Sequence, residues 1–324
     1  MSALNGLYQD VYQAITTHET IIIIPHQRPD GDCLGSAIGL KDIIQSSFPN
    51  KHVYAIGEET GYLKFLGALD VIEDDVFKDA CVIAVDTANQ ERMADSRYTL
   101  GKTLIKIDHH INIDSYGDIE IVDTTSPAAA QMIMDFYTAN QPHLSMSPTG
   151  AQALFTGILT DTGRFKYDGV SERTFLAVAA LYQNGLDPKP VYAALEVMSE
   201  ALIRFKGYVL LNYQKTEDGV AFIKITKALC DEFSVSTEEA SSLVNELSHF
   251  EDAPIWVLFN EYEDDKVVRA RIRSKGPNIS ITANAFNGGG HAKASGANLG
   301  TWDVADELLK ALNEVAKTYK FEEK

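Results

Sequence analysis

Residues 20–35, TIIIIPHQRPDGDCLG, decide the fold of the N-terminal half of the chain. Residues 21–24 are four isoleucines, and such a β-branched run predicts a short strand buried on both faces of a sheet. Prolines on both sides of His26 interrupt the regular structure, and the apolar pattern over residues 34–47 predicts a helix. Strand, loop and helix form the half-unit of a doubly wound α/β fold, in which ligands bind beyond the carboxyl ends of the strands.

The loop in this stretch carries three side chains that can bind a metal ion, His26, Asp30 and Asp32. One imidazole and two carboxylates suit Mn²⁺ or Mg²⁺ better than a soft metal. The alternative is an ordinary Asp-Gly-Asp turn, in which Asp32 caps the following helix. This stretch alone leaves both interpretations open.

The composition bounds the class of protein. The chain has 324 residues, of which 45% are hydrophobic and 23% charged, so we expect a globular protein of two domains. No apolar run could span a bilayer, the N-terminus lacks the pattern of a signal peptide, and three separated cysteines favour a reducing compartment. We therefore expect a cytoplasmic protein that does not bind membranes.

The charge is distributed unevenly along the chain. A net charge of −18 argues against binding of long nucleic acid. Residues 266–302, however, contain six Lys or Arg and no Asp or Glu. This local basic region indicates a site for a small anionic ligand.

Further short apolar runs alternate with helical patterns and predict a mostly parallel sheet. We expect an amphipathic helix over residues 4–17 and strands over residues 52–56, 81–85, 104–107 and 119–122. Ser126-Pro127 and Ser147-Pro148 each predict a helix start, with serine as the N-cap and proline at the first helical position.

From about residue 187 the pattern changes to near-continuous helix over residues 190–213. Strands are expected at 220–225, 255–260 and 266–273, the last two as a hairpin around Asp264-Asp265, and a helix from Trp302 onward. We therefore predict an N-terminal catalytic domain over residues 1–190, a helical linker over 191–215 and a smaller α+β domain over 216–324.

Three further segments place acidic and imidazole side chains where elements end. Asp86 and Asp108-His109-His110 each follow a predicted strand, and Asp161 ends a predicted helix. Carboxylates gathered at one edge of a sheet repel each other unless cations neutralise them. Two divalent metal ions would do so, and they would also supply a hydroxide nucleophile and a clamp for phosphoryl oxygens. The alternative is that these groups are loop polar residues or helix caps.

The second domain contains a separate set of anion-binding features. Arg269, Arg271 and Arg273 alternate with smaller residues, so a strand would place all three on one face, and guanidinium groups match phosphate geometry. The alternative is an exposed, charged strand face. Residues 288–290 are three glycines, which let a backbone approach a phosphate closely.

These motifs resemble those of a known family. The pattern His26-x-x-x-Asp30-x-Asp32 followed by Asp86, Asp108-His109-His110 and Asp161 resembles, in order and spacing, the four motifs of the DHH phosphoesterase superfamily. Residues 288–296, GGGHAKASG, resemble the glycine-rich motif of the associated DHHA1 domain. The resemblance covers the whole chain and is greatest to the bacterial nanoRNase/pAp-phosphatase group, whose relatives cleave pApA or cyclic di-AMP. It implies a DHH domain, a DHHA1 domain and an active site in the cleft between them.

The resemblance also implies a role for each motif residue. Two Mn²⁺ ions, with Mg²⁺ or Co²⁺ as substitutes, would be held by His26, Asp30, Asp32, Asp86, His109 and Asp161, with Asp86 bridging. His110 would contact or protonate the scissile phosphate, and Asp108 would orient an imidazole. Substrate binding would fall to Arg269, Arg271, Arg273, Ser274, Gly288, Gly289, Gly290, His291 and Ser295. One departure concerns substrate contacts: Gln131 stands where many relatives carry an acidic residue.

The expected activity is Mn²⁺-dependent hydrolysis of short RNA oligonucleotides (nanoRNA) and of 3′-phosphoadenosine 5′-phosphate (pAp) by a two-metal-activated hydroxide. The alternatives are a pApA or cyclic di-AMP phosphodiesterase, an inorganic pyrophosphatase and a nucleotide sensor without activity. The predicted partners are small nucleotides, and a homodimer is left open.

Overall fold

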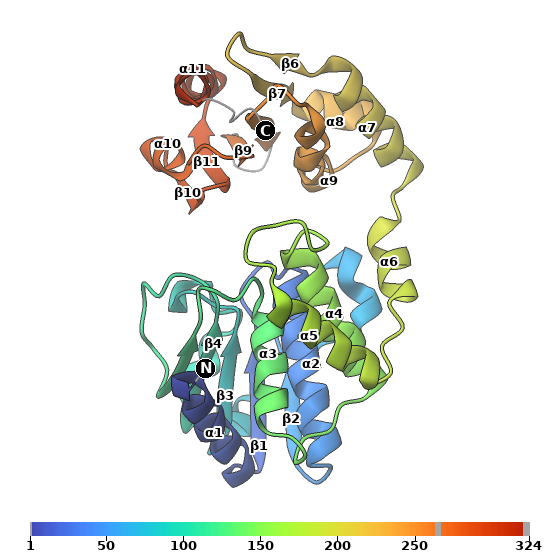
Figure 1. Cartoon of the computed structure of the whole chain (residues 1–324), viewed down its shortest axis with the longest axis vertical. Helices are drawn as coiled ribbons and strands as arrows, with labels where there is room; N and C mark the ends of the chain where they lie inside the picture. Colours follow the sequence, from blue (N-terminus) through green and yellow to red (C-terminus); the bar gives the residue numbers. More distant parts are fainter. Residues whose placement is uncertain (1, 263–266, 320–324) are drawn as a thin grey trace. The chain divides into compact units, whose positions relative to one another are not determined.

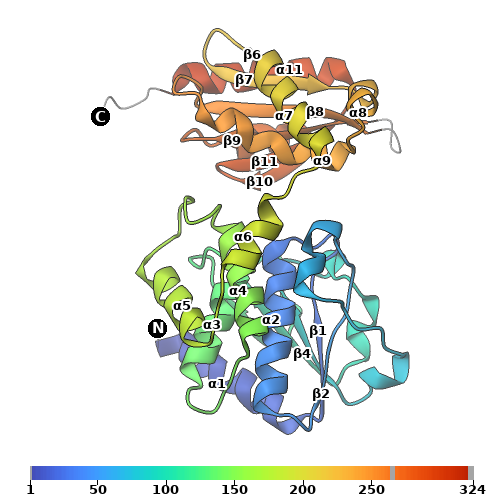
Figure 2. The ribbon, with the colours of Figure 1, turned by 90° about the vertical axis from the view of Figure 1, so that its right-hand side faces the viewer.

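The computed structural model describes residues 2–262 and 267–319. The chain divides into two compact units, Met1–Val197 and Met198–Lys324, which are described separately (Figures 1 and 2). The helix predicted over residues 190–213 is interrupted: α6 (Lys189–Glu196) and α7 (Glu200–Asn212) are separated by three residues. The domain bounds given above stay a prediction.

The first unit is built on a parallel sheet. Its strands are β1 (Thr20–Ile24), β2 (His52–Ala55), β3 (Cys81–Val85), β4 (Thr103–Asp108) and β5 (Ile119–Val122), in the order β2-β1-β3-β4-β5. All four neighbouring pairs are parallel, so the mostly parallel sheet is confirmed. The carboxyl ends of its strands therefore meet at one edge, where such folds bind ligands.

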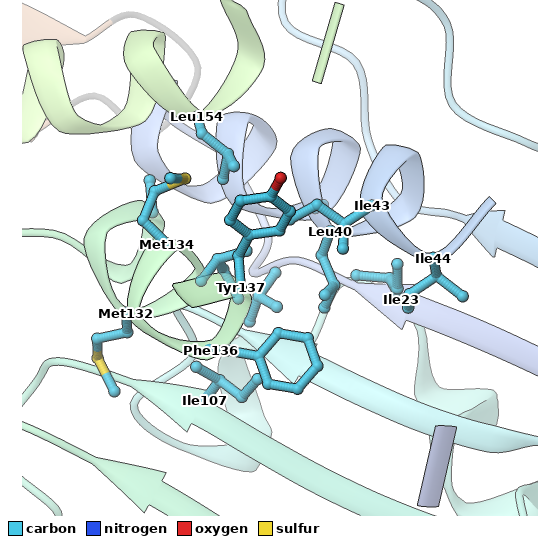
Figure 3. Packing of buried hydrophobic residues seen from close by; sticks show 14 of the residues in the cluster. Ile23, Leu40, Ile43, Ile44, Ile107, Met132, Met134, Phe136, Tyr137 and Leu154 are labelled. Atoms are coloured by element: carbon cyan, nitrogen blue, oxygen red, sulfur yellow. The ribbon is translucent and has the colours of Figure 1, made fainter. Parts of the chain in front are cut away.

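Helices cover one face of this sheet. α1 (Ser2–Thr17), α2 (Gly31–Ser47) and α3 (Ala129–Ala139) contact the strands, and α4 (Pro148–Asp161) and α5 (Glu172–Gln183) pack on these helices. Isoleucines of the strands, such as Ile23 and Ile107, pack with Leu40 of α2 and with Phe136 of α3 (Figure 3). These buried apolar side chains supply most of the favourable free energy of folding, and they fix α2, α3 and α4 beside one another (Figure 1).

Short 3₁₀ helices and loops cover the opposite face. They include η2 (Asp74–Phe77), η3 (Gln90–Arg92) and η4 (Ser96–Leu100), whereas η1 (Gly61–Leu66) packs through Leu63 and Leu66 against α2 and α4. Phe77 and Met93 pack there against the second row of strand side chains, which includes Ile22 and Val82.

The helix starts show one correct and one wrong sequence prediction. Ser147 caps α4 as predicted, with its side chain accepting from the backbone of Thr149 and Gly150. The predicted cap at Ser126 is wrong, because α3 begins only at Ala129. The first amides of α3 are instead satisfied by a distant side chain: Asp32 accepts from Ala129 N at 2.6 Å and from Ala130 N at 2.9 Å.

The second unit holds a mixed sheet in the order β10-β11-β9-β8-β7-β6. Its strands are β6 (Gln214–Lys215), β7 (Val220–Ile225), β8 (Ile255–Tyr262), β9 (Val267–Ser274), β10 (Gly288–His291) and β11 (Ala294–Gly300). The β8–β9 pair is antiparallel as predicted, while its connection at Asp264 and Asp265 lies outside the described residues.

Helices pack on both faces of the second sheet. The helices other than α7 are α8 (Lys227–Phe233), α9 (Thr237–Ser242), η5 (Leu243–His249), α10 (Ser280–Ala285) and α11 (Trp302–Thr318). One core joins α10 and α11 to Val257 and Ala270. A second core joins the helices of residues 200–249 to Ile223 and Leu258. Within the described ranges, no helix combines the length and apolarity that crossing a bilayer requires.

Candidate metal and catalytic site

Asp86 is the centre of a cluster at the carboxyl edge of the first sheet. It directly follows β3 and has a φ of 52°, a left-handed conformation that aspartate tolerates better than most residues. Its side chain is buried, with Oδ2 lying 3.5 Å from His26 Nε2 and Oδ1 lying 3.3 Å from His109 Nε2. Among the described residues, Oδ1 has no hydrogen-bond partner of good geometry. A buried carboxylate oxygen without a hydrogen-bond donor is unfavourable unless a cation or a further donor binds it.

Two imidazoles face this carboxylate with the same ring nitrogen. His26 Nδ1 lies 2.8 Å from the Gln27 carbonyl, and His109 Nδ1 lies 3.2 Å from the Ser126 carbonyl. A carbonyl only accepts, so these contacts favour a hydrogen on each Nδ1 and, in a neutral ring, a lone pair on Nε2. At His26 the carbonyl contact is the shorter of two, since Arg92 Nη2, a donor, lies 3.3 Å from the same Nδ1. Each lone pair points at carboxylate oxygens, an arrangement of acceptors that is stable only with a proton or a metal ion between them.

The remaining predicted ligands surround the same atoms. Asp161 Oδ2 lies 3.4 Å and Asp32 Oδ2 3.9 Å from His109 Nε2, while Asp30 Oδ2 lies 4.0 Å from His26 Nε2. Asp30 also caps α2, since its Oδ1 accepts from the amides of Asp32 and Cys33. The turn interpretation and the cluster are therefore compatible, with the cap on Asp30 rather than on Asp32.

His110 lies in a different setting from His109. Its Nδ1 lies 2.8 Å from Asp108 Oδ1 and 3.5 Å from Asp86 Oδ1. Asp108 is fully buried as the last residue of β4, whereas about a quarter of the His110 side chain is exposed. The short contact joins the His110 ring to Asp108; the orienting function of that aspartate stays a prediction.

In the cluster, burial and neighbouring charges together raise the pKa values of His109 and Asp32 and lower that of Asp86. Burial disfavours the charged form of His109, but Asp86, Asp32 and Asp161 outweigh it and raise its pKa to about 10. Burial and the Asp86 charge raise the pKa of Asp32 to about 7. Burial also acts to raise the pKa of Asp86, yet the imidazoles of His109 and His26 lower it overall. The cluster thus attracts positive charge.

These observations fit a site for divalent cations. Among the residues that the structure describes, three sets of groups converge closely enough to hold a metal ion: His26, Cys33 and Asp86; Asp86, His109 and His110; and Asp32, His109 and Asp161. Asp86 belongs to two of these sets, and its bridging of two ions stays a prediction. Every predicted metal-binding residue except Asp30 belongs to one of these sets, and Asp30 lies beside them, 4.0 Å from His26 Nε2. The predicted donors are oxygen and imidazole nitrogen, which suit Mn²⁺ or Mg²⁺.

The sequence analysis missed three residues near the cluster: Cys33, Lys106 and Arg92, whose Nη2 lies 3.3 Å from His26 Nδ1. Cys33 is buried and its sulfur accepts from the His26 amide at 3.0 Å, which explains its place in one set. Lys106 is fully buried in β4 and lies 3.9 Å from Asp108 Oδ2. The sequence contained a signal for this residue, because a lysine between two isoleucines interrupts an otherwise apolar strand.

In the second unit the predicted arginine face is present. Arg269, Arg271 and Arg273 alternate along β9 with the buried Ala270 and Ile272. Strand register places His291 of β10 in the same row as Arg273, through Ala294 of β11. Because side chains alternate across a strand, the three arginines and His291 share one face.

A hollow of about 290 Å³ opens on this face. Its lining includes Asn260, Tyr262, Arg269, Arg271 and Asn298. The Arg269 guanidinium lies over the Tyr262 ring, 4.5 Å from its centre, which orients the cation. The hollow is thus polar and positively charged.

Other predicted substrate residues lie elsewhere. Ser274 and Ser295 are buried on the opposite face, where their hydroxyls donate to the carbonyls of Pro277 and His291 at 2.6 and 2.8 Å. Gly288 lacks room for a side chain because a Cβ would lie 2.2 Å from the Gly296 carbonyl. Gly290 has a φ of 127°. Strand packing and backbone conformation therefore account for these two glycines, whereas Gly289 lies on the arginine face.

Comparison with known proteins identifies the family. Residues 20–158 match the model of the DHH family, N-terminal domain, and residues 219–318 match that of the DHHA1 domain. The chain is 36% identical to the bifunctional oligoribonuclease and PAP phosphatase NrnA of Bacillus subtilis over 96% of its own length and 99% of that protein. The chain belongs to the DHH phosphoesterase family.

Further relatives agree with this assignment. A probable bifunctional oligoribonuclease and PAP phosphatase NrnA of Streptococcus mutans is 35% identical over 96% of this chain and 99% of the relative. A crystal structure of an exopolyphosphatase-related protein from Bacteroides fragilis has the same fold, with a TM-score of 0.87, 24% identity and coverage of 96% and 98% of the two chains. The present chain is thus an enzyme of the DHH family that hydrolyses phosphate esters. Its site contains candidate metal-binding groups.

Proposed function

We propose that this DHH phosphoesterase uses Mn²⁺ to hydrolyse very short RNA oligonucleotides and pAp. The observation that carries the proposal is the pair of imidazoles, His26 and His109, whose Nε2 atoms face the buried Asp86 from two sides. The relatives named above, oligoribonucleases and PAP phosphatases, support the choice of substrates.

Two cations would be held by the six predicted ligands: His26, Asp30, Asp32, Asp86, His109 and Asp161. When bound, such ions polarise phosphoryl oxygens and lower the pKa of water. Gln27 and Ser126 hold the His26 and His109 rings through their backbone carbonyls and keep Nε2 available.

His110 would act on the phosphate ester itself. Its Nδ1 is held by Asp108, so its other nitrogen is the one that can reach a ligand. This ring would stabilise the phosphate or give a proton to the leaving oxygen, as general acids do.

A turnover panel tests the proposal and its alternatives. The substrates are pAp, pApA, di- to pentaribonucleotides, cyclic di-AMP and pyrophosphate, each with and without Mn²⁺. We expect pAp and the shortest oligoribonucleotides to be hydrolysed with the largest kcat/KM. Preference for pApA or cyclic di-AMP would favour the phosphodiesterase alternative, pyrophosphate turnover would favour a pyrophosphatase, and no turnover would favour a sensor.

Metal binding should strengthen as the pH rises. A cation that binds His109 Nε2 must displace the proton held there, because the pKa of His109 is raised to about 10. Between pH 7 and pH 9 the affinity should therefore rise by about tenfold per pH unit. Below pH 7 the slope should be steeper, since the pKa of Asp32 is raised to about 7 and a second proton competes.

Titration calorimetry with Mn²⁺ measures this linkage. Paired buffers with different ionisation enthalpies count the protons released, and we expect about one near pH 8. An affinity that does not change between pH 6.5 and pH 9 would contradict a role of His109 as a ligand.

The second unit should contribute to binding of the part of the substrate that does not react. Arg271 is exposed on β9, and a charge-assisted contact with phosphate is worth about 1.5–3 kcal/mol. Arg271→Ala should therefore lower kcat/KM for pAp or a dinucleotide by about ten- to a hundredfold. A small aryl phosphate ester, which has no second phosphate, should be cleaved at nearly the wild-type rate.

Arg204→Ala is the matched control, because Arg204 is also an exposed arginine of the second unit but pairs with Glu200 on α7. It should leave both substrates unaffected. If Arg271→Ala lowers kcat/KM equally for both substrate types, this arginine acts at the reacting phosphate. If kcat/KM is unchanged for both, Arg271 is a solvated surface residue without a role in substrate binding.

A further inference from the structure

Lys106 is a charged residue in the interior of the first unit. It is fully buried in β4, on the sheet face covered by loops and 3₁₀ helices, where Leu104 precedes it in the same row. Burial of an ammonium group is costly unless its donors are satisfied and a negative charge lies near. A lysine at this position is therefore stable only if hydrogen-bond acceptors and a negative charge surround its ammonium group.

The ammonium group has a full set of acceptors. Nζ donates to the Ala88 carbonyl at 2.9 Å, to Asn112 Oδ1 at 3.2 Å and to the Asp114 carbonyl at 2.9 Å. The Tyr116 ring lies below it, with its centre at 4.6 Å. Three N–H groups thus meet three acceptors.

These acceptors come from two of the loops that carry the site. Ala88 follows Asp86 by two residues, and Asn112 and Asp114 follow His110 by two and four. Tyr116 adds a second link, because its hydroxyl donates to the Thr87 carbonyl at 2.7 Å. Lys106 therefore joins the loop after β3 to the loop after β4.

Lys106 also lies beside the aspartate that holds His110. Asp108 Oδ2 is buried, has no hydrogen-bond partner among the described residues, and lies 3.9 Å from Lys106 Nζ. Asp108 Oδ1 contacts His110 Nδ1 at 2.8 Å. Away from water, a unit charge at this distance interacts far more strongly than at the surface. The lysine thus compensates the carboxylate that orients the imidazole.

We propose that Lys106 is a positioning residue for the phosphoesterase reaction, which acts by holding Asp108, and through it the His110 ring, in register with Asp86. It touches neither the cluster around Asp86 nor the exposed side of His110. The part of the inference that concerns catalysis rests on the function proposed above for His110; the part that concerns the ring does not.

Lys106→Met tests the inference, because methionine keeps most of the apolar stem and removes the charge and the donors. We expect kcat to fall by about ten- to a hundredfold, the loss associated with small misplacement of a reacting group. KM and the calorimetric Mn²⁺ affinity should stay within about twofold, because the ligands of the cluster are untouched. A merely structural role would not separate kcat from KM in this way.

A spectroscopic readout is independent of activity. In metal-free protein labelled with ¹⁵N-histidine, the wild-type His110 ring should show a single state with hydrogen on Nδ1, assigned with His110→Gln. In Lys106→Met the ring should show exchange between tautomers. If wild type hydrolyses no phosphate ester, the proposed function fails, and this measurement still decides the role of Lys106 toward the ring.

Lys51→Met is the matched control. Lys51 also donates to two backbone carbonyls, those of Thr16 and His18, and lies over the Phe48 ring, but it precedes β2 at the opposite edge of the sheet. It should leave kcat and the His110 signals unchanged. An equal fall in kcat in both variants would show a general loss of stability and overturn the proposal.

Asn112→Ala replaces the first variant if Lys106→Met does not fold. It removes one of the three acceptors and leaves the lysine in place. The expected fall in kcat is about three- to tenfold, together with exchange of the His110 ring; it is smaller than for loss of a whole hydrogen bond to a charged group because Asn112 is exposed and water can replace its oxygen. Wild-type kcat and unchanged ring signals, in folded Lys106→Met or in this substitute, would overturn the proposal.

Discussion

Asp86→Ala is expected to abolish binding of both metal ions and to lower turnover by on the order of 10⁴-fold, as loss of a central catalytic group does. The physical reason is the position of Asp86, whose two oxygens approach the Nε2 atoms of His26 and His109 at 3.5 and 3.3 Å. Without the carboxylate, the two imidazoles lose the negative charge that attracts a cation between them. Mass spectrometry of bound metal and kcat on pAp measure the two effects.

Asp118→Asn is the control for this prediction. Asp118 is also an aspartate beside a strand of the same sheet, but it accepts from the Leu104 amide near the amino end of β4, at the edge away from the cluster. It should retain metal and turnover. Full metal occupancy in Asp86→Ala would show that Asp86 does not bridge two ions.

His110→Ala is expected to keep both metal ions and to lower kcat by about 10²–10³-fold, the usual loss when a general acid is removed. The reason is the contact of its Nδ1 with Asp108, which directs the ring differently from His26 and His109, whose Nδ1 atoms face backbone carbonyls. The measurements are metal content and single-turnover rates on pAp.

The result that would contradict this prediction is an exchange of roles between His109 and His110. If His110→Ala loses metal and His109→Ala retains it, their predicted roles are reversed. His52→Ala, an exposed histidine at the start of β2, should change neither quantity.

The fold and the cluster were largely predictable from the sequence because both depend on local signals. The isoleucine run of β1 and the apolar run of β3 predicted buried parallel strands, and parallel strands bring their last residues to one edge. The sequence alone therefore places Asp86 and Asp108 together. Ser147-Pro148 predicted the start of α4 for the same reason, since a helix cap is local.

What the sequence did not reveal depends on contacts between distant residues. Ser126-Pro127 carries the local signal of a helix start, yet α3 starts later because Asp32, 97 residues away from Ala129, binds its first amides. The burial of Lys106 is explained only by its three hydrogen-bond acceptors, which come from two different loops. The resemblance to the DHHA1 domain assigned Ser274 and Ser295 to substrate binding, and only the strand register shows that they face the side opposite the arginines.

The capping of α3 by Asp32 bears on the choice of an inactive form for trapping substrate. Asp32 is fully buried, and both its oxygens accept from amides of α3, so its removal would weaken the fold together with the site. Loss of a helix cap alone costs about 0.5–2 kcal/mol. A substitution at His110 leaves every helix cap in place and is therefore the better choice for a folded, substrate-trapping protein. For the same reason, a lineage that lost this activity could change His110 freely but would retain Asp32 for the sake of the fold.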